Sequence, residues 1–311
     1  MRPFMDGDEP AISELFAESY GRELDIAAWR WRFCESPCGP GNVELAWDRE
    51  RLAAHYAVSA VLLSVEGREV SAGLSGTTMT HPRYRGYGLF PALAERVYAR
   101  MTGCGKDLVL GFPNPQSHRG FIRDLGWKDL CAIPTMRVQV DKYTGPPVSN
   151  TRELDSFDER FDSLWTETKD DYLIIARRDR AHLQWRYRDR PGVKYRIVVA
   201  ETNGQLDGFA VTKRYEQEID VVDMLVPARA VKTGERLISA AVAEAQSADA
   251  GAVNLWLPVG NPLHHQLEKD GFRLESPVTY FAARCFDRSL DTQQAYDYRS
   301  WYLTMGDSDV F

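Results

Sequence analysis

Apolar side chains recur at helical spacing near the start of the chain. Ile12, Leu15 and Phe16 are three and four residues apart within residues 10–20, which is typical of a helix with one buried face. A second helix is predicted directly after it, over residues 24–33. Apolar and β-branched side chains then dominate three segments, which we expect to form strands at residues 43–47, 52–65 and 69–80.

A clear apolar stripe follows these strands. Its members recur every three or four residues and comprise Leu89, Phe90, Leu93, Ala94, Val97, Tyr98 and Met101. Beyond this helix the pattern predicts a short buried strand at residues 107–112, a helix at 117–125 and a closing strand at 133–140. Strands grouped ahead of a strand–helix–strand crossover indicate a mixed sheet with helices on its faces.

The same series of motifs occurs a second time along the chain. Trp31-Arg32-Phe33 recurs as Trp185-Arg186-Tyr187, Met79-x-x-Pro82 as Met224-x-x-Pro227, and Asn114-Pro115-x-x-His118 as Asn261-Pro262-x-x-His265. Because the matches keep their order, they indicate a duplication. We attribute the repeated Trp-Arg pair to packing of a helix against the sheet. The expected fold is α/β, with two tandem domains, each a twisted mixed sheet flanked by helices.

The boundary between the two domains is predicted from turn-forming residues. Residues 141–151 contain Gly145-Pro146-Pro147 and form the expected linker. This places an N-terminal domain at residues 1–142, a C-terminal domain at 151–286 and a polar tail at 287–311. The role of the tail is not predicted, although Trp301, Tyr302 and Phe311 are large enough to pack back against the domains.

Composition excludes several classes of protein. The net charge of −7 over 311 residues argues against a nucleic-acid partner, because phosphate binding needs an excess of Lys and Arg. No apolar run approaches the roughly 20 residues that a bilayer requires, and no signal peptide is visible. The five cysteines lack C-x-x-C spacing, and Cys34-x-x-x-Cys38 has no second pair facing it, so no metal is expected. We expect a cytoplasmic protein without a membrane partner.

Candidate chemistry lies between the third strand and the helix with the apolar stripe. Arg83-Tyr84-Arg85-Gly86-Tyr87-Gly88 is an anion-binding arrangement, because glycines allow close approach and amides at a helix start point at a ligand. The two arginines add charge-assisted hydrogen bonds. The loop contains neither a Walker motif nor G-x-G-x-x-G, which disfavours nucleotide hydrolysis and dinucleotide binding.

The R-x-x-G-x-G pattern after His81-Pro82, together with the element order of residues 1–140, resembles the GNAT N-acyltransferase superfamily. The resemblance implies acyl-CoA, acetyl-CoA or longer, as co-substrate, with its pyrophosphate on the loop and without a metal. Its pantetheine arm would pair with the preceding strand. The implied cofactor-binding residues are Thr78, Met79, Thr80, Arg83, Tyr84, Arg85, Gly86, Tyr87, Gly88, Leu89, Phe90, Asn114, Ser117 and Phe121.

The second copy departs from this pattern. Its loop at residues 227–234 keeps one glycine of the motif, so side chains would obstruct a pyrophosphate. We interpret it as a degenerate domain that forms a wall of the acceptor site. Asp223 stands where Thr78 stands in the first copy, and it could hold an acceptor hydroxyl or amine, or be a solvated or paired carboxylate. Tyr172 could stack on a base or ring, but core packing explains it equally well.

The catalytic residues are less defined. Many GNAT enzymes place a proton-donating Tyr at the position of Ile122, and the second copy has Leu267 there, so the usual acid is absent. His55, on a strand expected to face the cleft, is the first candidate base because imidazole titrates near neutral pH. His81 is the second candidate and His118 the third. Each could equally be a structural histidine, with the proton lost to water.

The resemblance extends to a group with paired domains that resemble sugar N-acyltransferases of bacterial polysaccharide pathways. Its marks here are the Trp31-Arg32-Phe33 motif, Thr78-Met79-Thr80-His81-Pro82 and Gly111-Phe112-Pro113-Asn114. This implies transfer of an acetyl or short hydroxyacyl group to the amine of a nucleotide-linked amino sugar, by a monomer or homodimer. The alternatives are an amino-acid or antibiotic amine as acceptor, and a non-catalytic acyl-CoA sensor.

Overall fold

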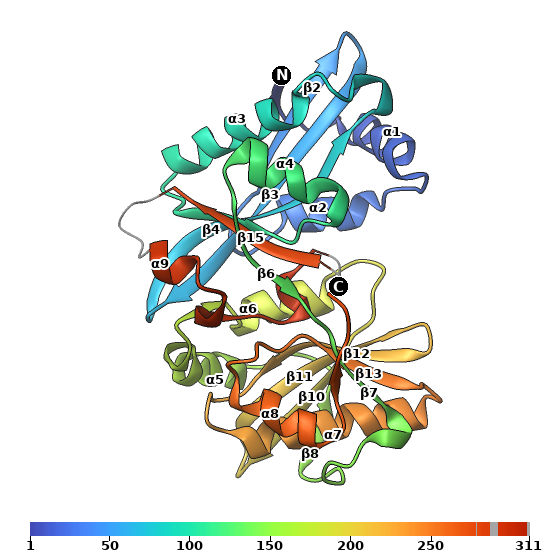
Figure 1. The fold of residues 1–311 in the computed structure, drawn as a ribbon, viewed down its shortest axis with the longest axis vertical. Coiled ribbons are helices and arrows are strands. Elements are labelled where there is room, and N and C mark those ends of the chain that lie inside the picture. The colour runs from blue at the N-terminus through green and yellow to red at the C-terminus, as the bar shows by residue number, and fades with distance from the viewer. Residues whose placement is uncertain (278, 287–291, 310–311) are drawn as a thin grey trace.

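A computed structural model describes residues 1–277, 279–286 and 292–309. The predicted tail therefore falls partly outside the described residues, as does Phe311. The molecule consists of two sheet-and-helix units, one above the other in Figure 1. The first half contains β1 (Arg2–Pro3), α1 (Glu9–Tyr20), α2 (Ile26–Cys34), β2 (Asn42–Asp48), β3 (Arg51–Val65), β4 (Arg68–Thr80), α3 (Leu89–Gly103), β5 (Leu108–Gly111), α4 (Pro115–Leu125), β6 (Lys128–Ile133) and β7 (Met136–Gln139).

The second half repeats this order of elements with one additional strand, β9, between its first two helices, which confirms the expected tandem arrangement. It contains β8 (Thr151–Leu154), α5 (Arg160–Thr168), β9 (Ile174–Ala176), α6 (Arg180–Leu183), β10 (Arg196–Thr202), β11 (Gln205–Tyr215), β12 (Glu218–Leu225), α7 (Val231–Ser247), β13 (Ala252–Leu255), α8 (Pro262–Lys269), β14 (Arg273–Leu274) and β15 (Thr279–Cys285). A π-helical turn, Gln184–Arg188, continues α6. The last described elements are α9 (Thr292–Ala295) and β16 (Trp301–Tyr302).

Both sheets are mixed, as predicted. Within the described residues, the first sheet runs β1-β2-β3-β4-β5-β15-β6, with β9 joined to β3 and β16 joined to β9. The second runs β14-β7-β13-β12-β11-β10-β8. In each sheet the strand before the long helix is parallel to the strand after it, so that β4 pairs with β5 and β12 with β13. The crossover helices α3 and α7 each cover one face of their own sheet (Figure 1).

The two halves exchange their last strands. The strand predicted at residues 133–140 corresponds to β7, and a separate strand that was not predicted, β6, precedes it. β7 lies in the second sheet, between β13 and β14. In return β15 lies in the first sheet, between β5 and β6. Both exchanged strands are well buried, since Met136 on β7 and Phe281 on β15 are 0% exposed in their adopted sheets. The domain boundaries at residues 142 and 151 are untested and remain a prediction. Each sheet contains strands from both sides of these boundaries.

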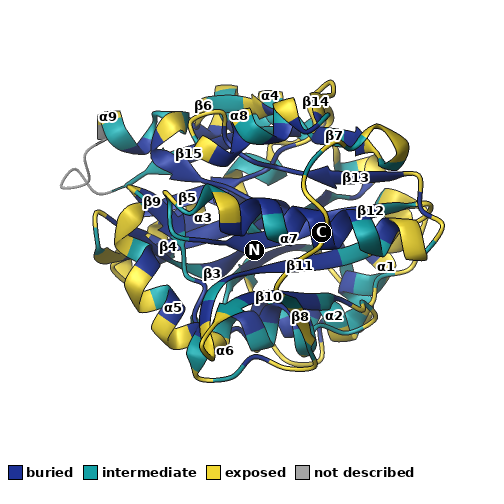
Figure 2. Ribbon diagram, turned by 90° about the horizontal axis from the view of Figure 1, so that it is seen from below, coloured by how far each residue is buried: buried dark blue, intermediate teal, exposed yellow. Residues whose placement is uncertain are grey.

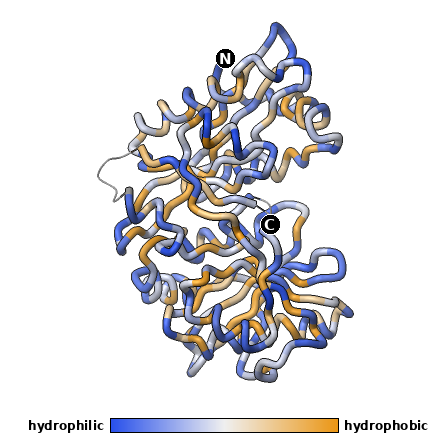
Figure 3. Tube along the Cα trace, in the orientation of Figure 1, coloured by the Kyte–Doolittle hydropathy of each residue, from blue (hydrophilic) through white to orange (hydrophobic). Residues whose placement is uncertain are grey.

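The core follows the strands through both halves. Figure 2 shows buried strands at the centre and exposed residues on the surrounding helices and loops. The hydropathy colouring of Figure 3 agrees, since apolar segments lie inside each unit. β12 is buried along almost its whole length, as expected for a strand covered on both faces. Among the described helices, none is long and apolar enough to span a bilayer.

The repeated Trp-Arg motifs meet at the contact between the halves. The rings of Trp31 and Trp185 stack at 4.6 Å with an interplanar angle of 18°. Each indole N–H donates to the other residue's backbone oxygen, at 2.8 Å from Trp31 and 3.1 Å from Trp185. The prediction that these residues pack a helix against its own sheet was therefore incomplete, because the two tryptophans pack against each other.

Candidate functional site

The edge of β4 opens where its pairing with β5 stops. β4 pairs with β3 to its end, but with β5 only over residues 72–75. Residues 76–80 continue beyond the last pair, and the β3–β4 ladder slips there, with Thr77 at φ 53°. A bulge of this kind turns a strand locally and leaves backbone groups unpaired. The predicted residues Thr78, Met79 and Thr80 lie on this edge, which no strand covers. The Tyr20 hydroxyl donates to Thr78 O at 2.7 Å and Arg85 Nε to Thr80 O at 3.4 Å, so an extended ligand that pairs with these backbone oxygens would replace both side chains.

The predicted phosphate loop continues directly from this edge. Residues 82–84 form a 3₁₀ turn, and Gly88 caps α3 in the left-handed conformation, at φ 72°. Gly86 is also left-handed, at φ 84°. No described atom lies within 4 Å of the place that a β-carbon would take at either glycine. The loop is mostly exposed, so amides at the start of α3 and the side chains of Arg83 and Arg85 can reach an anion.

Helix α4 borders the same end of the sheet. Phe121 is buried and contacts Phe90 at the start of α3, with ring centroids 5.1 Å apart. Asn114 is the N-cap of α4, and its side-chain oxygen accepts from the amides of Gln116 and Ser117, both at 3.0 Å. The structure thus places Phe90 and Phe121 in contact, and it gives Asn114 a capping role that the prediction did not include.

Contrary to the prediction, His55 does not face the cleft. It is 0% exposed within β3, and its two ring nitrogens are engaged. Nδ1 bonds the oxygen of Thr77 at 2.7 Å, and Nε2 accepts from the Trp29 indole at 3.3 Å. Burial lowers the pKa of His55 to about 4, although the hydrogen bond to Thr77 opposes this shift. This arrangement argues for a neutral structural histidine rather than a base.

The other two candidate bases lie beside the cofactor loop and on α4. His81 is buried where β4 ends, and its Nδ1 accepts from the Arg83 amide at 3.0 Å. Its Nε2 lies 3.2 Å from a carboxylate oxygen of Glu18. His118 pairs with Asp129 at 2.6 Å and stacks on Tyr280. Of the three, His81 is next to the loop, and its catalytic role remains a prediction.

Hydroxyl groups gather beneath the open edge. Tyr56 and Tyr98 share a hydrogen bond of 2.8 Å, and the Ser75 hydroxyl donates to Tyr56 at 3.0 Å. Burial raises the pKa of both tyrosines, so both are protonated at neutral pH. Ser75 is the last β4 residue paired with β5. Tyr84, by contrast, points away from this group and donates to Asp48 at 2.7 Å.

A cavity of about 350 Å³ lies between the halves. Its walls come from α2, from one face of β3 and β4, and from residues 301–309 of the tail. Ser59, Val61 and Leu63 line it, whereas Tyr56 and Val58 contact the α3 side of the sheet, so the cavity is on the face opposite α3. Thr77 also lines it, which places the bulge of β4 at the cavity wall. The stacked pair Trp31 and Trp185 forms another part of the wall.

The predicted acceptor residues are elsewhere. Asp223 is buried and accepts from Arg178 at 3.0 Å, Thr304 at 2.9 Å and Tyr187 at 2.8 Å. It is therefore a paired core carboxylate, the alternative that the sequence left open. Arg178 also bridges to Asp307 at 2.8 Å, so this network ties the tail to β12.

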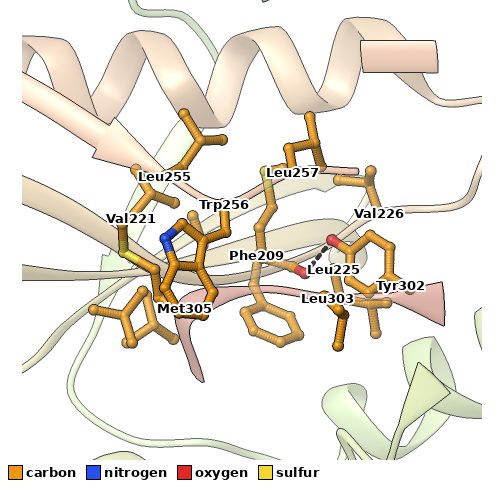
Figure 4. Close-up of a cluster of buried hydrophobic side chains, with 14 of the residues drawn as sticks. Phe209, Val221, Leu225, Val226, Leu255, Trp256, Leu257, Tyr302, Leu303 and Met305 are labelled. Carbon is orange, nitrogen blue, oxygen red and sulfur yellow. Dashed lines mark hydrogen bonds between the residues drawn. The ribbon is translucent and has the colours of Figure 1, made fainter. Parts of the chain in front are cut away.

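In the described residues, two tyrosine hydroxyls bond the edge of β12 beyond β13, whereas on β4 one, from Tyr20, donates to Thr78 O at 2.7 Å. β12 pairs with β13 only over residues 218–221, but tyrosine hydroxyls bond its continuation. Tyr302 donates to Met224 O at 2.6 Å and Tyr172 to Val226 O at 2.7 Å. Figure 4 shows Tyr302, Leu303 and Met305 packed among the apolar side chains of this region. Tyr172 is thus half-buried and packs against the core, and it is not among the residues that line the cavity.

Sequence reasoning missed the tail and Arg32 as parts of the site. The tail is too polar and irregular for periodicity to place it. Arg32 did carry a signal, because it belongs to the repeated Trp-Arg motif, but it was attributed to packing. Among the described residues, no cluster of three or more His, Cys, Asp or Glu could hold a metal ion.

Comparison with known proteins agrees with this geometry. Residues 1–129 match the model of the acetyltransferase (GNAT) domain. No curated protein matches the chain. Among solved structures it resembles a GCN5-related N-acetyltransferase from Anabaena variabilis, with 12% identity, a TM-score of 0.72, and coverage of 91% of this chain and 71% of that one.

Two further structures share the fold over most of the chain. Eis1 from Mycobacterium abscessus has 14% identity and a TM-score of 0.66, covering 95% and 75%. N-myristoyltransferase from Saccharomyces cerevisiae, with bound myristoyl-CoA, has 14% identity and a TM-score of 0.59, covering 89% and 75%. These structures confirm the expected fold. The match of residues 1–129 to the GNAT domain model confirms the expectation of an acyl-CoA-dependent acyltransferase, without specifying its acceptor.

Proposed function

We propose that the chain transfers an acetyl or short hydroxyacyl group from acyl-CoA to the amine of a small acceptor in the cavity between its halves. One observation carries the proposal: β4 borders both sites. Its open edge at residues 76–80 leads to the phosphate loop, and its bulge residue Thr77 lines the cavity. A thioester on this edge and an amine in the cavity would therefore meet at one strand.

The donor site fits acyl-CoA in shape and charge. The loop glycines leave space for a pyrophosphate, and Arg83 and Arg85 add positive charge beside it. The pantetheine arm would pair with the backbone of residues 78–80. Since the corresponding loop of the second half, residues 227–234, keeps only one glycine of the motif, we expect one acyl-CoA per chain.

For the acceptor, we propose a nucleotide-linked amino sugar. The cavity volume is within the usual range of about 300–1,000 Å³ for small-molecule pockets, and its aromatic wall suits a ring. The resemblance of the sequence motifs to sugar N-acyltransferases supports this class. An amino acid or an antibiotic amine is the alternative acceptor.

The reaction forms an amide bond and breaks a thioester bond. The neutral amine attacks the thioester carbon, loses a proton, and expels the CoA thiolate, which takes up a proton. Water would remove the amine proton, or His81 if its Nδ1 gave up the hydrogen bond that it accepts from the Arg83 amide. Ile122 occupies the position of the usual acid and cannot donate a proton to the CoA thiolate. Ser75, Tyr56 and Tyr98 are protonated hydroxyl groups next to the open edge of β4, and one of them could donate it instead.

Binding and turnover test the proposal separately. Acetyl-CoA should raise the thermal midpoint of the protein, and Gly86→Asp should abolish that shift because it adds a negative side chain at the pyrophosphate position. Gly204→Asp is the matched control, since Gly204 is equally left-handed, at φ 80°, but lies on the β10–β11 hairpin. If acetyl-CoA and longer acyl-CoAs give no shift, the proposal is wrong.

Release of free thiol distinguishes an enzyme from a sensor. Acetyl-CoA and UDP- or dTDP-linked amino sugars should give thiol with the wild-type protein and with Gly204→Asp, but not with Gly86→Asp. A thermal shift without thiol release from any amine would instead support the non-catalytic acyl-CoA sensor.

A further inference from the structure

Arg32 extends from α2 to the edge of β4. Its guanidinium lies against Gly76, where a β-carbon would be only 2.3 Å from Nη2, so only glycine permits this approach. Gly76 is the first residue beyond the β4–β5 pairing. Arg32 therefore lies where the open edge begins, and it also lines the cavity.

The guanidinium of Arg32 is incompletely paired. Its side chain is 13% exposed, and Nη1 lies 3.3 Å from a carboxylate oxygen of Asp309 in the tail. Nη2 is buried and has no hydrogen-bond partner among the described residues. A buried charged donor without a partner is costly, so natural proteins rarely keep one that has no use.

The surroundings of Arg32 add positive charge. Arg186 and Arg190 line the same cavity. Burial lowers the pKa of Arg32, and the nearby positive charge of Arg186 lowers it further. Asp307, the other tail carboxylate in the wall, is paired with Arg178. Glu23 and Asp25 also line the cavity, but Arg186 and Arg190 both interact electrostatically with Arg32, so the part of the wall next to Arg32 is suited to an anion.

We propose that Arg32 binds an anionic group of the acceptor, a carboxylate or a phosphate, and holds the nearby amine at the end of the β4 edge. This inference rests on the proposed function and narrows its substrate class. Nη2 donates to the anion, and Asp309 is the counterion that Arg32 keeps before the acceptor arrives. Antibiotic amines with several positive charges are excluded from this position, because like charges repel.

Matched pairs of amines test the proposal. The pairs are glycine with glycinamide, and glucosamine 6-phosphate with glucosamine, so the two arms distinguish a carboxylate from a phosphate. Thiol release from acetyl-CoA gives kcat/KM for each amine, and calorimetry in the presence of CoA gives its affinity. In at least one pair we expect the anionic member to be preferred at least about tenfold, in turnover or in binding.

Three variants attribute that preference to Arg32. Arg32→Gln should reduce the ratio between the anionic and neutral members to about one, and Arg32→Lys should retain part of it. Asp309→Asn should increase the affinity for the anionic member severalfold and leave the neutral member unchanged, because it removes the competing carboxylate. Far-UV circular dichroism and the thermal shift with acetyl-CoA show whether each variant is folded.

Two results would overturn the proposal. The first is a wild-type protein that neither uses nor binds the anionic member of either pair better than the neutral one. The second is a folded Arg32→Gln protein that still prefers the anionic amine over the neutral one. If Arg32→Gln does not fold, the proposal is instead overturned by an Asp309→Asn protein whose affinity for the anionic amine is unchanged. The proposed function fails separately, by loss of the acetyl-CoA shift or of all thiol release.

Discussion

A buried imidazole with both nitrogens bonded behaves differently from an exposed one. His55 is surrounded by apolar groups of α2 and β3, and its partners are a backbone oxygen and an indole. A strand position alone could not distinguish this environment from a cleft, because both faces of β3 are covered, one by α3 and the other by α1 and α2. The sequence therefore identified the residue but not its surroundings.

The burial of His55 predicts a loss of stability in acid. Its pKa is about 4 in the folded state, below the ordinary value of 6.5, so the unfolded chain binds the extra proton between these values. The unfolding free energy should fall as pH decreases from 6.5 to 4, by roughly 1 kcal/mol per pH unit for each such histidine. Burial lowers the pKa of His182 to about 4 as well.

Urea unfolding between pH 7.5 and 4.5 checks this expectation. His55→Gln and His182→Gln should each remove about half of the acid loss that these two residues cause. His55→Gln should also keep its thiol-release activity between pH 7 and 9. A folded His55→Gln protein with more than tenfold lower activity would show that the imidazole takes part in the reaction after all.

The paired carboxylate Asp223 gives a second prediction for single residues. Asp223→Ala leaves Arg178 buried with one carboxylate fewer, and breaking a buried pair in this way costs about 3–5 kcal/mol. Chemical unfolding measures the loss. The double variant Arg178→Met with Asp223→Leu should lose less than the two single variants added together. A single-variant loss below about 1 kcal/mol would contradict this account of the network.

Helices and strands with strong local patterns were predicted well. The first helix was expected at 10–20 and is Glu9–Tyr20, and the long strand expected at 52–65 is Arg51–Val65. The exchange of β7 and β15 was not predicted, because a strand has the same apolar pattern in either sheet. Its destination depends on contacts far apart in the sequence, which periodicity does not contain.

The duplicated helix caps make a prediction with an internal control. Asn114 caps α4 and Asn261 caps α8 through the same kind of side-chain bond. Asn114→Ala and Asn261→Ala should each lower the unfolding free energy by about 1 kcal/mol. If Asn114 also contacts the cofactor, only Asn114→Ala will raise the KM for acetyl-CoA. Equal KM values in the two variants would limit Asn114 to capping.

At the scale of the whole molecule, strand exchange makes the halves depend on each other. A fragment of residues 1–142 lacks β15, so β5 and β6 lose the strand between them and present open edges. We expect this fragment to be aggregated or without a cooperative unfolding transition, and co-expression with residues 143–311 to restore a soluble complex. Size-exclusion chromatography and thermal melts check both results.

Cleavage of the intact protein provides the control for that fragment. Residues 146–150 are exposed, so a protease site there should be cut without unfolding the chain. The cut halves should elute together with the uncut thermal midpoint. A fragment 1–142 that folds alone, with a cooperative transition, would contradict the dependence on β15.

The tryptophan contact has one more consequence. Each indole donates to the other residue's backbone, and each half lends its last strand to the other, which is how an isologous, strand-swapped homodimer is built. This chain has the architecture of such a dimer joined into one polypeptide. In a true homodimer both copies must carry every change. When the two copies are joined in one chain, a substitution affects only one of them. One half can then keep the glycine-rich loop proposed for acyl-CoA, while the other loses it and keeps a structural role.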